Sequence, residues 1–151
     1  MNLTIYTDGA ARGNPGPGGY GAILQWGTAR KEVSQGYRRT TNNRMELMAV
    51  IAALQQLKKD NVDITIYSDS AYVVNSVEKG WVFGWAKKGY KDKKNADLWA
   101  EFLTYYKKHK IKFVWVKGHA NNPFNNRCDE LATAAADSGN WLVDEGYENN
   151  L

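Results

Sequence analysis

The sequence has one cysteine, two histidines and no long apolar run, and each shortage is informative. A lone cysteine, Cys128, cannot form an internal disulfide, which suits a reducing compartment, so we expect a cytoplasmic protein. Few histidines and no paired spacing with cysteine argue against a zinc site. No apolar run approaches the roughly 20 residues of a membrane span. Residues 1–8 also lack the basic and apolar regions of a signal peptide.

The composition is that of an ordinary globular protein, with 43% hydrophobic and 24% charged residues over 151 positions. A chain of this length can bury roughly 70% of its unfolded surface, so we expect a single domain over residues 1–151. The net charge of +4 is unevenly spread. Residues 79–94 hold six lysines and one aspartate, while the tail from about residue 137 is acidic.

Aromatic side chains are interleaved with the lysines of residues 79–94. Lysines neutralise phosphates and aromatic rings stack on bases or sugars, so this segment favours a nucleic-acid partner. The alternative is a solvent-exposed face whose aromatic rings turn inward. The aromatic residues concerned are Trp81, Phe83, Trp85 and Tyr90.

Hydrophobic periodicity predicts an α/β fold, in which a mixed sheet carries helices on its faces. Three strands come first, at residues 2–7, 22–26 and 32–38, with a glycine- and proline-rich turn at 13–21. Their short connections favour an antiparallel meander. Helices are then predicted at residues 41–59, 71–79, 96–108 and 125–136, and further strands at 64–67 and 111–116.

Four acidic residues occupy positions where a site could form. Asp8 and Asp69 end predicted strands, and Glu46 and Asp129 lie early in predicted helices. Carboxylates gathered at one edge of a sheet repel one another unless a cation intervenes, and oxygen ligands favour Mg²⁺ or Mn²⁺. Each acid alone could equally begin a turn or stabilise a helix N-terminus. Periodicity does not show whether the four converge.

Four strings in order along the chain resemble bacterial type 1 ribonuclease H. They are TDGAARGNPGPGGYGAIL (7–24), TTNNRMELMA (40–49), YSDS (67–70) and VKGHANNPFNNRCDELA (116–132). A fifth string, GWVFGWAKKGYK (80–91), resembles the basic protrusion of that family. The resemblance covers nearly the whole chain.

The resemblance implies a ribonuclease H-like fold, with a five-stranded mixed sheet and helices on both faces. It implies an endonuclease that cleaves the RNA strand of RNA/DNA hybrids with two Mg²⁺ ions, leaving 5′-phosphate and 3′-hydroxyl ends, with little sequence preference. Mn²⁺ is a possible replacement. The implied metal ligands are Asp8, Glu46, Asp69 and Asp129, and His119 would assist proton transfer or product departure. We expect a monomer, and the sequence leaves a protein partner open.

The resemblance also assigns contacts with the substrate. The RNA strand would meet Asn14, Asn42 and Asn43. A DNA phosphate pocket would include Thr41 and Asn95, with Arg44 near them. An aromatic DNA channel would use Trp81 and Trp85, beside Lys87 and Lys88.

This chain departs from the family at several places. Ala71 stands where glutamine is common, and Asn121, Asn122 and Phe124 alter the histidine loop. The tail carries no motif, and we expect it to have a surface or packing role. Two rival functions remain at this point: a DNA strand-transfer nuclease, and a non-catalytic module that binds hybrids.

Overall fold

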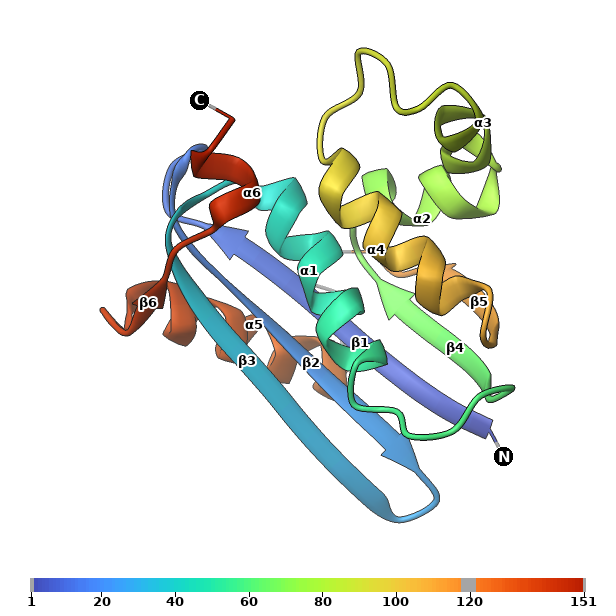
Figure 1. The fold of residues 1–151 in the computed structure, drawn as a ribbon. Coiled ribbons are helices and arrows are strands. Elements are labelled where there is room, and N and C mark those ends of the chain that lie inside the picture. The colour runs from blue at the N-terminus through green and yellow to red at the C-terminus, as the bar shows by residue number, and fades with distance from the viewer. Residues whose placement is uncertain (1, 118–121, 151) are drawn as a thin grey trace.

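The computed structural model describes residues 2–117 and 122–150, which form a six-stranded sheet with helices on both faces (Figure 1). The strands lie in the order β5-β4-β1-β2-β3-β6. The elements, in chain order, are β1 (Asn2–Ala11), β2 (Gly16–Trp26), β3 (Ala29–Thr40), α1 (Asn42–Leu54), β4 (Asp63–Ser68), α2 (Ala71–Glu78), α3 (Trp81–Lys87), α4 (Ala96–Tyr106), β5 (Lys110–Trp115), α5 (Pro123–Asp137), β6 (Trp141–Leu142) and α6 (Glu145–Glu148). The predicted mixed sheet, with three antiparallel strands first, is confirmed. The short strand β6 extends it beyond the five strands expected.

The glycine-rich segment is where the sequence prediction differs most from the structure. β2 begins at Gly16, whereas we expected a turn through residue 21. Gly19 and Gly21 pair with both neighbouring strands and lie against α5. A Cβ atom on either residue would lie 2.5 Å from the nearest α5 atom. The glycines are therefore strand residues that let a helix approach closely.

Parallel pairing brings the ends of β1 and β4 to the same edge of the sheet. Thr7 of β1 is in register with Ser68 of β4. The residues that follow, Asp8 and Asp69, are therefore neighbours in space although 61 positions separate them in sequence. β5 continues the parallel part beyond β4.

Helices α1 and α4 cover one face of the sheet, and α5 covers the other (Figure 1). Between α1, α4 and the sheet lies the core, in which Trp99 and Phe102 are fully buried. α1 ends at Leu54, earlier than the predicted end near residue 59. The chain turns there and Leu57 packs against the core from outside the helix. No helix formed by residues 2–117 and 122–150 has the length and apolar character that a bilayer crossing requires.

The acidic tail folds back onto the molecule. β6 pairs with β3, and α6 lies beside the N-terminal end of α1 (Figure 1). Between them, Asp144 is only 3% exposed although it is a carboxylate. Its Oδ2 accepts a hydrogen bond of 2.7 Å from the Thr40 hydroxyl. The tail has the packing role that we expected, but it also inserts a charged group that the sequence did not single out.

Candidate active site

Three carboxylates from three different elements meet where the pairing of β1 with β4 ends. Asp8 lies on β1, Glu46 in the second turn of α1, and Asp69 directly after β4. One oxygen from each lies within 4.8 Å of the others. Sequence reasoning proposed these acids one by one, and the structure brings these three together.

A glycine permits α1 to come this close to β1. A Cβ atom on Gly9 would lie 2.4 Å from the backbone nitrogen of Glu46, which is far inside van der Waals contact. The residue after Asp8 must therefore lack a side chain if the helix is to present Glu46 to the cluster. The backbone N–H of Gly9 also donates a 2.9 Å hydrogen bond to Asp8 Oδ1 and fixes its orientation.

Burial and the charge of neighbouring acids make Asp8 and Glu46 hard to ionise. Loss of hydration, followed by the charge of Asp69, raises the pKa of Asp8 to about 8. Burial is also the main cause that raises the pKa of Glu46 well above its ordinary value, with Asp8 and Asp69 adding to it. Such a cluster takes up protons or a cation to offset its negative charge.

Two oxygens of the cluster lack any hydrogen-bond partner among the described residues. They are Glu46 Oε1 and Asp69 Oδ1, and both are buried. Buried polar atoms are nearly always satisfied in folded proteins, so an unpartnered pair that faces a third carboxylate indicates a missing ligand. Oxygen donors alone suit a hard divalent cation such as Mg²⁺ or Mn²⁺ rather than zinc or copper. The residues present therefore fit a divalent metal site.

The fourth acid, Asp129, lies at the rim of this cluster. It is an exposed residue of α5, on the opposite face of the sheet from α1. It is nonetheless close enough that its hydrogen bonding and its charge both raise the pKa of Asp8. Asp8 and Glu46 are thus almost fully buried, whereas Asp69 and Asp129 lie nearer to solvent.

The backbone around Asp69 is held on both sides. The Ser68 hydroxyl accepts a hydrogen bond from the N–H of Ser70, and the Ser70 hydroxyl caps α2. From β5, the indole N–H of Trp115 donates to the carbonyl oxygen of Asp69 at 3.3 Å. Trp115 was not singled out from the sequence, because only the pairing of β4 with β5 brings it to this position.

A sequence model of the family described as RNase H matches residues 1–137. The chain belongs to the ribonuclease H family. It is 52% identical to ribonuclease H of Lachnoclostridium phytofermentans, over 98% of this chain and 100% of that protein. It is 49% identical to ribonuclease HI of Synechocystis sp., over 97% and 94% of the two chains.

Solved structures agree with this assignment. LC9-RNase H1, described as a type 1 RNase H with the type 2 active-site motif, has a TM-score of 0.81 and 32% identity, over 98% of this chain and 79% of that one. LC11-RNase H1, solved in complex with an RNA/DNA hybrid, has a TM-score of 0.72 and 28% identity, over 90% and 97% of the two chains.

Beside the carboxylates, this ribonuclease H has a cleft of about 630 Å³ at the start of α1. Five of the expected substrate residues line it: Asn14, Thr41, Asn43, Arg44 and Asn95. Asn42 is linked to the same place, because its N–H donates to the Asn14 side chain at 3.1 Å. Residues from the tail, Gly146, Tyr147 and Asn150, complete the wall.

Arg44 lies in the wall of the cleft but has no free donor for a phosphate. Its side chain is 3% exposed, and all five guanidinium N–H groups are engaged. They donate to Asp144, Asp97 and Asn95, with the ion-pair contacts between 2.7 and 2.9 Å. Arg44, which we expected near the phosphate pocket, is thus a buried anchor that hydrogen-bonds the Asn95 side chain at 3.4 Å.

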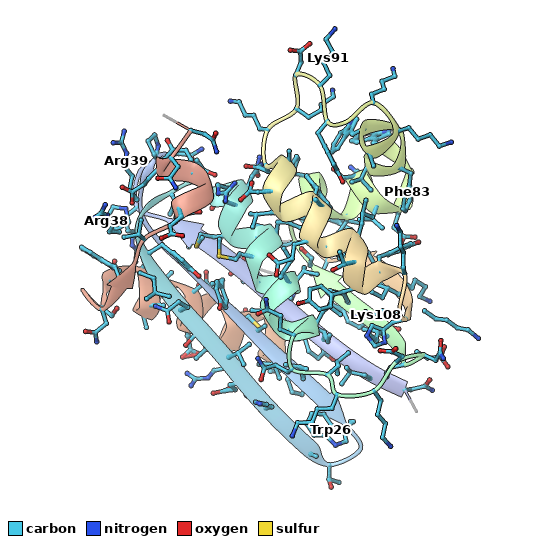
Figure 2. All side chains as sticks on the ribbon, in the orientation of Figure 1. Trp26, Arg38, Arg39, Phe83, Lys91 and Lys108 are labelled. Atoms are coloured by element: carbon cyan, nitrogen blue, oxygen red, sulfur yellow. The ribbon has the colours of Figure 1, made fainter. Side chains whose placement is uncertain are left out.

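The basic segment forms α3 and the loop that follows it, with Lys91 at the outer end of the loop (Figure 2). Trp81 is 46% exposed, with the Lys79 ammonium 5.5 Å from its ring centre. Trp85 is half-buried against Trp99 of the core. Phe83 and Tyr90 also pack against the core, as the alternative expected, whereas Trp81 faces outward. Lys87 and Lys88 are exposed.

His119 and Asn121 lie outside the described residues. Of the other departures in their loop, Asn122 caps α5 by accepting from the N–H groups of Phe124 and Asn125. The Phe124 ring stacks on Tyr6 at 4.7 Å. These two substitutions therefore have structural roles at the start of α5.

Proposed function

We propose that this ribonuclease H hydrolyses the RNA strand of RNA/DNA hybrids as a metal-dependent endonuclease. The supporting observation is the cluster of Asp8, Glu46 and Asp69, whose buried oxygens lack partners within a fold of this family. A strand-transfer nuclease would use similar chemistry on DNA. The family membership and the basic segment of residues 79–94 favour the hybrid as substrate.

Asp8, Glu46, Asp69 and Asp129 would hold the metal. Two Mg²⁺ ions, when bound, lower the pKa of the attacking water and stabilise the leaving 3′ oxygen, which yields 5′-phosphate and 3′-hydroxyl ends. Asp8 interacts with both Asp69 and Asp129, so it lies at the centre of the residues that would hold the metal. Its raised pKa means that it must release a proton as the site loads.

The substrate would be held by polar and basic groups on either side of the carboxylates. We assign Asn14, Asn42 and Asn43 to the RNA strand, because a polar surface beside the metal site can read 2′-hydroxyl groups. Thr41 and Asn95 would bind a DNA phosphate. The DNA strand beyond that phosphate would contact the basic segment, through Trp81, Trp85, Lys87 and Lys88. Contacts to sugar and phosphate carry little sequence information, so cleavage should show weak base preference.

His119 is assigned to proton transfer at the leaving group or to product departure. An imidazole can give or take a proton near neutral pH, which suits either step. We further propose that the enzyme acts as a monomer, because Asp8, Glu46 and Asp69 come together without a residue from a second chain.

A cleavage assay with an end-labelled RNA strand tests the function. The strand is presented alone, paired with RNA and paired with DNA, each with Mg²⁺, with Mn²⁺ and with EDTA. We expect cutting of the hybrid only, and only with a divalent ion. Cutting of duplex DNA would favour the strand-transfer reading.

The non-catalytic module would bind the hybrid in the same assay without cutting it in either metal. This alternative is physically unfavourable, because four carboxylates near a phosphate backbone weaken binding unless a cation is present.

A further inference from the structure

Three aromatic rings stack on the face of the sheet that α5 covers. Tyr6 of β1 is the ring that both of the others contact. Its centre lies 5.2 Å from that of Tyr67 in β4 and 4.7 Å from that of Phe124 in α5. Both pairs are close to parallel, with interplanar angles of 15° and 17°. Two strands and a helix are thus joined through three stacked rings.

The two tyrosines each come two positions before an acid of the metal cluster. Tyr6 and Asp8 both lie on β1, where side chains two positions apart project from the same face. Tyr67 precedes Asp69, which directly follows the end of β4. Tyr6 and Tyr67 are also partners in the parallel register of the two strands. The stacked rings therefore lie about 7 Å along the strands from the two acids.

The third ring docks the start of α5 on β1. Phe124 lies in the first turn of α5, and the guanidinium of Arg30 lies 5.4 Å from its ring centre. One turn further along the helix, the Cys128 thiol donates a hydrogen bond of 3.3 Å to the carbonyl oxygen of Tyr6. Both contacts thus join α5 to the same residue of β1. The residue that follows Cys128 is Asp129, the fourth acid.

Asp129 depends on this docking more than the other acids do. Asp8 and Asp69 are placed by the pairing of β1 with β4. Asp129 reaches Asp8 from a helix on the other face of the sheet, so the distance between them changes whenever α5 shifts. Mg²⁺ requires oxygen ligands at about 2.0–2.1 Å in an almost ideal octahedron, and working sites hold their ligands to within about 0.5 Å. A small shift of α5 would weaken metal binding without unfolding the protein.

We propose that the stacking of Phe124 on Tyr6 positions Asp129 for metal binding, so that Phe124 sets the metal affinity of the enzyme. This role rests on the proposed metal-dependent function. Phe124 is a positioning residue, because its hydrocarbon ring offers no ligand to an ion. In the sequence it is one of the departures from the family pattern in the histidine loop, and its contacts assign it to the support of the metal site. A purely structural role would lower the stability and leave the metal affinity unchanged.

Metal binding in the absence of substrate tests the proposal. The unaltered chain, Phe124→Leu and Phe124→Ala are titrated with Mn²⁺, and electron paramagnetic resonance measures the free ion. We expect both variants to bind Mn²⁺ about tenfold or more weakly, and Phe124→Tyr, which keeps the ring, to stay within about twofold of the unaltered chain. The matched control is Tyr37→Leu, which removes a ring 6.3 Å from that of Tyr20 elsewhere in the sheet. This control should bind Mn²⁺ as the unaltered chain does.

A double-variant cycle shows whether Phe124 acts through Asp129. Asp129→Asn alone should weaken Mn²⁺ binding, and adding Phe124→Leu to it should weaken binding no further. Hybrid cleavage gives a second readout. In Phe124→Leu the half-saturating Mg²⁺ concentration should rise by the same factor as the dissociation constant for Mn²⁺, while KM for the hybrid at saturating Mg²⁺ stays unchanged.

Circular dichroism and thermal denaturation in EDTA establish that each variant is folded. The positioning role is overturned if Phe124→Leu and Phe124→Ala bind Mn²⁺ as the unaltered chain does, or if Tyr37→Leu weakens binding equally. It is also overturned if Phe124→Leu causes its full loss of affinity in the Asp129→Asn background. An unaltered chain that neither binds Mn²⁺ nor cleaves the hybrid would overturn the proposed function itself, and the positioning role with it.

Discussion

At the residue scale, Asp8 combines three properties that rarely coincide in a carboxylate. It is buried, it neighbours other acids, and its pKa is raised to about 8 by burial and then by Asp69. A neutral side chain of the same shape at this position would cost less free energy to bury when the protein folds. The arrangement therefore favours a site that binds a cation once Asp8 is ionised.

We predict that Asp8→Asn loses activity and retains the fold. Loss of a ligand that holds charge-stabilising ions costs several kcal/mol in the transition state, or about 1,000-fold in kcat at about 1.4 kcal/mol per tenfold. Steady-state cleavage of a labelled hybrid in Mg²⁺ measures the loss, and circular dichroism reports the fold. Asp63→Asn, an exposed acid at the start of β4, is the control and should keep normal turnover. Turnover by Asp8→Asn within tenfold of the control would show that the site lies elsewhere.

At the element scale, the tail is joined to α1 through one buried ion pair. Arg44 Nε donates to Asp144 Oδ2 at 2.8 Å, and both side chains are almost fully buried. A second carboxylate, Asp97 of α4, pairs with the same guanidinium at 2.7 Å and has its pKa held below its ordinary value by that hydrogen bond. Three separate elements thus depend on Arg44 for their relative positions at the cleft.

We predict that Asp144→Ala destabilises the protein by about 3–5 kcal/mol, because it leaves a buried guanidinium partly unpaired. KM for the hybrid should also rise, since Arg44 hydrogen-bonds Asn95, a proposed phosphate ligand. Urea denaturation and steady-state kinetics measure the two effects. Glu148→Ala, which breaks the more exposed ion pair with Arg38, is the control and should change stability far less than Asp144→Ala. Equal stability of the two variants would mean that the tail is not held through Arg44.

The α3 segment supports a separate prediction. Replacing Lys87, Lys88 and Lys91 with alanine should raise KM for the hybrid, because each lysine that neutralises a phosphate releases a counterion. The slope of log KM against log salt should fall by about 1 per lost phosphate contact. Kinetics between 50 and 200 mM salt measure it, with Lys107, Lys108 and Lys112 changed together as the control. An unchanged slope in the α3 variant would place the DNA strand elsewhere.

At the scale of the whole molecule, the sequence predicted those features that local patterns encode. Strand and helix order, the mixed sheet and the place of Asp69 after a strand follow from periodicity. Asp8, expected to end its strand, lies inside β1, which runs to Ala11. The family motifs add the convergence of the acids. The extent of β2 was wrong because glycines that suit a turn also suit a strand pressed against a helix, as Gly19 and Gly21 are. Asp144 and Trp115 were missed because their partners, Arg44 and Asp69, are distant in sequence and only tertiary pairing selects them. A lone acid in an acidic tail gives no local sign of burial.

The whole molecule should also respond to pH and metal together. Asp8 has an unfolded pKa near 3.8 and a folded pKa of about 8, so the folded state binds more protons across that interval. Without metal, the contribution of Asp8 to stability is therefore fully present below pH 4 and is lost as pH rises to about 8. Divalent ions bind the ionised form, so the stabilisation by Mg²⁺ should grow over the same interval.

Thermal denaturation from pH 5 to pH 9, in EDTA and in Mg²⁺, measures this linkage. Mg²⁺ at about 100 times its dissociation constant should add about 2.7 kcal/mol at the alkaline end, and much less at pH 5, where protons occupy the cluster. Asp8→Asn removes both the repulsion and a ligand, so in EDTA it should be more stable than the unaltered chain at pH 9. It should also gain little from Mg²⁺ at any pH. A Mg²⁺ effect that is independent of pH, or equal in Asp8→Asn, would show that the ion stabilises the protein at some other place.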